Sequence, residues 1–81
     1  MTQHKPGMPV SVIVHEEPIE LSSFLKLGQV TMSGGEAKSI VQAGIVKVNG
    51  EVELRRSRKL RHGDTVEVDG QVVLRVEVEA R

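Results

Sequence analysis

Two turn sequences, Asn49-Gly50 and Asp69-Gly70, constrain the fold of the C-terminal half more than any other feature of the chain. Each sequence favours a two-residue hairpin turn. Both residues of such a turn adopt a positive φ, and Asn, Asp and Gly tolerate this conformation best. Apolar and polar residues alternate on both sides of each turn, as they do in half-buried strands. We therefore predict four short strands, over residues 46–48, 51–54, 65–69 and 72–78.

The N-terminal half predicts one strand and a short amphipathic helix. Valines at positions 10, 12 and 14 share one face of a strand over residues 10–15. The sequence Glu16-Glu17-Pro18 ends this strand. Apolar residues then recur at helical spacing from Ile19 to Leu27, which predicts a helix that ends at Gly28 in the left-handed conformation.

A second helix is predicted to begin at Gly34. The preceding Ser33 and the following Glu36 have the spacing of a capping box, in which the serine accepts from the Glu36 N–H and the glutamate reaches back. Ala37, Ile40 and Val41 form one apolar stripe, and Gly44 is a stop signal.

The resulting fold class is α+β, with two short helices packed on a small, mainly antiparallel sheet of about four to five strands. With 81 residues, we expect a single domain over residues 10–81, preceded by a flexible tail over residues 1–9. Phe24 is the only aromatic residue, so the core must be aliphatic. No apolar run approaches the length of a membrane span, and the N-terminus lacks the pattern of a signal peptide, so we expect a cytoplasmic protein.

Positive charge is concentrated in the middle of a chain whose formal net charge is zero. Residues 38–62 contain seven Lys and Arg but two carboxylates, which gives a charge of +5, whereas residues 1–37 and 63–81 carry −2 and −3. Residues 55–61 alone contain four Arg and one Lys without an acid. Because guanidinium groups bind phosphate oxygens in a bidentate manner, this run predicts a phosphate-binding surface.

Enzymatic, metal and cofactor sites lack the residues they would need. There is no cysteine, and the histidines at positions 4, 15 and 62 do not have the spacing of metal ligands. The Gly34-Gly35 pair belongs to neither a dinucleotide-binding nor a P-loop motif. We therefore predict a non-catalytic protein without a metal, a cofactor or a small-molecule substrate.

The order and spacing of these features resemble the alpha-L RNA-binding domain, also called the S-four domain. The resemblance covers about half of the chain, from Phe24 to Val68, and rests on the stretches FLKLGQV, SGGEAK, AGIVKVNGE, RRSRKL and HGDTVEV. The chain is most similar to small stand-alone bacterial members, of the YaaA-like and YbcJ-like type, in which almost nothing is appended to the domain.

The resemblance implies a positively charged RNA-binding face made by the two helices and the strand and loop that follow them. Many members have a basic residue where Gly34-Gly35 stand, so the backbone N–H groups of this helix start are expected to meet phosphate instead. The residues assigned to RNA binding by position are Ser33, Gly34, Lys38, Lys47, Asn49, Arg55, Arg56, Arg58, Lys59 and Arg61.

The expected partner is structured RNA, either ribosomal RNA or a ribosomal complex that contains tRNA. Tyr and Trp are absent, and without them single-stranded bases have no stacking platform, whereas phosphates, 2′-hydroxyls and shape remain readable. The alternative is a protein–protein adaptor whose basic face binds an acidic protein, because charge complementarity does not identify the acid. A monomer is the simplest state for either function.

Overall fold

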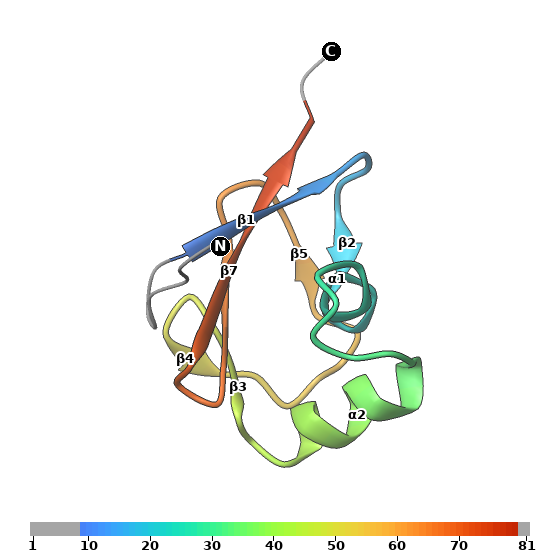
Figure 1. Ribbon diagram of the computed structural model, residues 1–81, viewed down its shortest axis with the longest axis vertical. Coiled ribbons are helices and arrows are strands. Elements are labelled where there is room, and N and C mark those ends of the chain that lie inside the picture. Colours follow the sequence, from blue (N-terminus) through green and yellow to red (C-terminus); the bar gives the residue numbers. More distant parts are fainter. Residues whose placement is uncertain (1–8, 80–81) are drawn as a thin grey trace, which may run out of the picture.

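The computed structural model describes residues 9–79, and they form two helices and seven strands (Figure 1). The predicted tail over residues 1–9 lies outside this range except for Pro9, the first residue of β1. The elements are, in order, β1 Pro9–Val14, β2 Ile19–Glu20, α1 Leu21–Leu27, α2 Gly34–Gln42, β3 Val46–Val48, β4 Glu51–Val52, β5 Lys59–Leu60, β6 Thr65–Val68 and β7 Val72–Val78.

Five of the strands form one mixed sheet in the order β1-β7-β6-β3-β4, and β2 and β5 pair separately. Within the five-stranded sheet, only β1 and β7 are parallel. The predicted α+β class, with its mainly antiparallel sheet, is confirmed. The small β2–β5 sheet was missed, since Ile19 was placed in the first helix and residues 55–61 in a loop. The strand predicted over residues 51–54 ends at Val52.

Both predicted hairpin turns have the backbone conformation that their sequences require. The φ angles are 52° at Asn49 and 87° at Gly50, and 54° at Asp69 and 67° at Gly70. Consecutive positive φ values characterise the type I′ turn, whose twist matches that of the flanking strands. These turns fix the registers in which β3 pairs with β4 and β6 pairs with β7.

Helix α2 begins at Gly34, as predicted, with Ser33 as its N-cap. The Ser33 Oγ accepts a hydrogen bond from the Glu36 N–H at 3.2 Å. The Glu36 carboxylate accepts from the N–H of Met32 at 2.6 Å, one residue before the position that a reciprocal capping box uses. Gly44 follows the helix with a φ of 81°, which confirms the predicted stop.

The end of α1 differs from the prediction. Gly28 has a φ of −79°, and the left-handed residue is Gln29, with a φ of 63°. Gly28 is needed for a different reason, because a Cβ at this position would lie 2.9 Å from the Cδ1 atom of Leu74. Close packing of α1 on β7, rather than backbone conformation, therefore explains this glycine.

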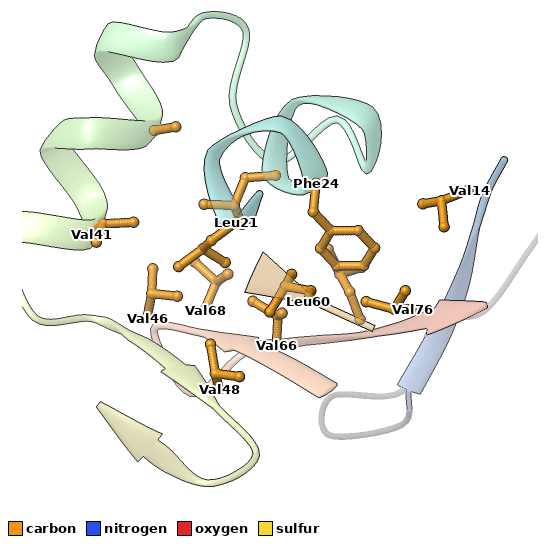
Figure 2. Packing of buried hydrophobic residues seen from close by; sticks show 13 residues of the cluster. Val14, Leu21, Phe24, Val41, Val46, Val48, Leu60, Val66, Val68 and Val76 are labelled. Carbon is orange, nitrogen blue, oxygen red and sulfur yellow. The ribbon is translucent and has the colours of Figure 1, made fainter. Parts of the chain in front are cut away.

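Both helices pack on one face of the five-stranded sheet and enclose an aliphatic core. Figure 2 shows Phe24 and Leu21 of α1 directed toward Leu60, Val66 and Val76, and all five side chains are buried. Burying each such side chain contributes about 1.5–3 kcal/mol, so this layer fixes the position of the helices on the sheet. Among residues 9–79, no helix is long and apolar enough to cross a membrane.

Candidate nucleic-acid interface

Residues 55–61, which we call the basic segment, are attached to the N-terminus of α1 by backbone hydrogen bonds. The helix begins after Glu20, whose side chain caps no N–H group. The carbonyl oxygens of Arg58 and Arg56 replace this cap, since they accept from the N–H groups of Leu21 at 2.8 Å and Ser22 at 3.0 Å. The basic segment is therefore held beside α1, as the resemblance implied.

Glu53, the residue two positions before the basic segment, is the anchor of this loop. It is 8 % exposed, and its Oε1 atom lies 2.7 Å from Nη1 of Arg58. Its Oε2 atom accepts from the Nε of Arg55 at 3.2 Å and from the Arg55 backbone N–H at 3.1 Å. The hydrogen bond from Arg58, followed by that from Arg55, lowers the pKa of Glu53 from 4.5 to about 2, although burial acts in the opposite direction.

The last two cations of the basic segment also have acidic partners. Lys59 Nζ lies 3.0 Å from Oε2 of Glu20, and Arg61 Nη1 lies 3.9 Å from Oε2 of Glu17. Both basic side chains remain more than half exposed, so these pairs stabilise the fold weakly. Within the part of the chain that the structure describes, Arg56 is the basic-segment cation without an ion pair.

On α2, the predicted residues have different roles. Ser33 is occupied as the N-cap, whereas Lys38 is exposed and has no ion pair among the described residues. Lys38 follows Gly34 by four residues and therefore lies on the same side of the helix. A Cβ at Gly34 would meet no atom within 4 Å, so the start of α2 is open to a phosphate group.

Lys47 lies away from the other predicted cations. It stands in β3 between the buried Val46 and Val48, which face the helices, so its side chain projects from the opposite face of the sheet. There it is paired in register with Glu67 of β6. The structure therefore does not bring Lys47 to the side where the helices and the basic segment meet.

The Asn49 side chain forms hydrogen bonds with other residues of the protein. Its Oδ1 accepts from the N–H of Thr65 at 2.9 Å and from the Thr65 hydroxyl at 3.3 Å, and its Nδ2 donates to Oδ1 of Asp64 at 3.1 Å. The other oxygen of Asp64 accepts from the Arg61 N–H at 2.8 Å. Asn49 thus links its own turn to the start of β6 and, through Asp64, to the end of the basic segment.

Replacing Asn49 with alanine is expected to lower the free energy of unfolding by about 2–3 kcal/mol. The side-chain hydrogen bonds are lost, and alanine tolerates a positive φ less well than asparagine. The matched control is Asp69→Ala, at a turn residue of almost the same φ whose side chain makes no hydrogen bond among residues 9–79. Urea unfolding of both variants measures the difference. Equal losses would show that the Asn49 bonds add nothing beyond turn conformation.

Lys26 was not among the predicted binding residues, although the structure places it where α1 leads into α2. It is exposed in the last turn of α1, and it lines a hollow together with Thr31 and Met32, the residues that lead into α2. Its position off the apolar stripe of the first helix is the sequence signal for an exposed cation. Helices α1 and α2 pack against each other, and the basic segment is bonded to the start of α1, so three of the five Lys and Arg side chains without ion pairs in the described chain come from adjoining elements. We call Lys26, Lys38 and Arg56 the cationic set.

Comparisons with known proteins agree with this architecture. A family model described as the S4 domain matches residues 12–77. The chain is 47 % identical over 62 residues to a Bacillus subtilis protein named probable ribosome maturation protein RlbA, across 76 % of this chain and 84 % of the relative. It is 42 % identical over 55 residues to the putative RNA-binding protein YbcJ of Escherichia coli, across 68 % of this chain and 79 % of the relative.

The solution structure of E. coli YbcJ, described as revealing an αL motif involved in RNA binding, superposes with a TM-score of 0.66 and 32 % sequence identity. The match covers 95 % of this chain and 98 % of that one, so the likeness extends well beyond the half of the chain on which the resemblance was first based. By the match over residues 12–77 and by its relatives, the chain belongs to the S4 domain family.

Proposed function

We propose that this protein is a non-catalytic RNA-binding protein that docks on structured ribosomal RNA during ribosome maturation. Membership of the S4 family and the names of the B. subtilis and E. coli relatives support the RNA partner and the process. A complex that contains tRNA is a narrower version of the same proposal. The protein acts by binding, without a metal, a cofactor or a small-molecule substrate.

The observation that carries the proposal is the position of the cationic set. Arg56 is held beside α1 by its own carbonyl, and Lys26 and Lys38 extend from the two packed helices, beside the open start of α2. Arg55, Arg58, Lys59 and Arg61 are ion-paired, so they add to the local field and hold the loop. The cationic set makes the phosphate contacts that dominate affinity.

A salt titration tests this proposal. If the cationic set neutralises three phosphates, log affinity for ribosomal RNA fragments should fall with log salt at a slope of about −2 to −3. Each phosphate contact contributes ~0.7–0.9 to the magnitude of this slope. Participation of the ion-paired Arg and Lys side chains would steepen the slope. Binding that is indifferent to salt, or no binding at low salt, would contradict the proposal.

Copurification distinguishes RNA from an acidic protein partner. We expect the purified protein to carry nucleic acid that RNase removes and DNase does not. A partner protein that stays bound after RNase treatment would instead favour the adaptor function, in which the same cations meet carboxylates.

A further inference from the structure

A cavity of about 450 Å³ opens where α1 leads into α2, and the basic segment does not contribute to it. Its walls are formed by Lys26, Gln29, Thr31 and Met32. The volume lies within the range of small-molecule clefts, roughly 300–1,000 Å³. Because Lys26 also belongs to the cationic set, the cavity is continuous with the proposed RNA-binding side of the protein.

Two of the lining residues have features that folding does not explain. Met32 is 92 % exposed, although a large apolar side chain gains stability from burial. Thr31 is 3 % exposed, and its hydroxyl oxygen has no hydrogen-bond partner within residues 9–79. An unpaired buried hydroxyl costs stability, and a valine of the same shape would avoid this cost. The Met32 side chain is therefore accessible to a ligand, whereas the Thr31 hydroxyl is enclosed by the protein.

Gln29 adds a third feature. It is a non-glycine residue at a φ of 63°, a conformation that glycine would adopt without strain. Its side chain is exposed and carries two N–H donors and a carbonyl acceptor. Such a side chain matches the mixed donors and acceptors along the edge of a nucleobase.

We propose that this cavity holds one unstacked base of the bound RNA, an inference that rests on the proposed function. The Met32 thioether packs on the face of the base through a sulfur–π contact, and so replaces the missing aromatic platform. Gln29 binds the base edge, and Lys26 binds the phosphate of the same nucleotide. Sequence-specific readers of RNA use splayed bases in loops and bulges in this way.

The test compares a fully paired RNA stem with the same stem carrying a single-nucleotide bulge of A, C, G or U. We expect the wild-type protein to bind at least one bulged stem about tenfold more tightly than the paired stem, equivalent to 1.36 kcal/mol. Met32→Ala and Gln29→Gly are expected to reduce this ratio about three- to tenfold while leaving affinity for the paired stem unchanged. Gln42→Ala, on the exposed surface of α2, is the matched control and should keep the ratio.

Unfolding measurements separate recognition from folding. Gln29→Gly should unfold at the same or a higher urea concentration than wild type, because glycine adopts a positive φ without strain. Met32→Ala should unfold at the same concentration, because the side chain that it removes is exposed. A wild-type ratio of one, or a ratio that both variants leave unchanged, would overturn the base pocket but not the RNA-binding function. Failure of every stem to bind at low salt would count against the proposed function itself.

Discussion

Replacing Arg58 with alanine is expected to lower the free energy of unfolding by about 2–3 kcal/mol at neutral pH. The change removes the 2.7 Å hydrogen bond to the buried Glu53 and leaves that carboxylate with Arg55 as its remaining basic partner. Breaking a buried ion pair costs roughly 3–5 kcal/mol. The expected loss of stability is smaller here because the Arg58 side chain is 35 % exposed. Urea unfolding monitored by circular dichroism measures the loss.

Arg56→Ala is the matched control, because it removes a neighbouring arginine side chain that forms no ion pair in the described part of the chain. Its backbone carbonyl, which caps α1, is retained in the variant. We expect a change of less than about 0.5 kcal/mol, as is usual for surface substitutions. If the two variants were equally stable, Glu53 would not be the anchor of the basic segment.

The same anchor predicts how stability depends on pH. The pKa of Glu53 is about 2 in the folded protein and 4.5 as its ordinary value, so the ionised group stabilises the fold above pH 4.5. This contribution, at most about 3 kcal/mol at 1.36 kcal/mol per unit, is lost as the pH falls from 4.5 to 2. Glu53→Gln should therefore be less stable than wild type at pH 7, and the difference should shrink toward pH 2. A difference that stays constant would contradict the assignment.

Local signals in the sequence were sufficient for the hairpins and for the start of α2. The Asn49-Gly50 and Asp69-Gly70 turns depend on the backbone preferences of their own two residues, and the Ser33 cap depends on a partner three residues away. Gly28 was misinterpreted because its requirement comes from Leu74, 46 positions along the chain. The β2–β5 sheet was missed for a similar reason, since two-residue strands have no period of their own and form only through their pairing.

The site could be predicted as a region but not as a set of free charges. Residues 55–61 looked uniformly cationic, yet their partners Glu17, Glu20 and Glu53 come from outside the run. The alternating pattern around Lys47 indicated a strand correctly, but the strand face on which the helices pack is a tertiary property. Neither fact has a signal in the local sequence, which explains why structural and binding arginines could not be separated beforehand.

This separation leads to the largest expected effect on binding. The triple variant Lys26→Ala, Lys38→Ala and Arg56→Ala removes the cationic set, and it is expected to weaken affinity for ribosomal RNA fragments about a hundredfold at 100 mM salt. The estimate takes on the order of 1 kcal/mol for each exposed phosphate contact. The slope of log affinity against log salt should fall in magnitude by about 2 to 3. Filter binding over a series of salt concentrations measures both quantities.

The control variant is Lys47→Ala with Arg75→Ala, which removes two exposed cations from the sheet face opposite the helices. Salt screens charges that lie far from the bound RNA. We therefore expect the affinity of this control variant for RNA to fall less than about threefold. Both variants should retain wild-type stability, since none of the five side chains forms an ion pair within residues 9–79. If the control weakened binding as much as the triple variant, the RNA would contact the outer sheet face, and Lys47 would belong to the interface.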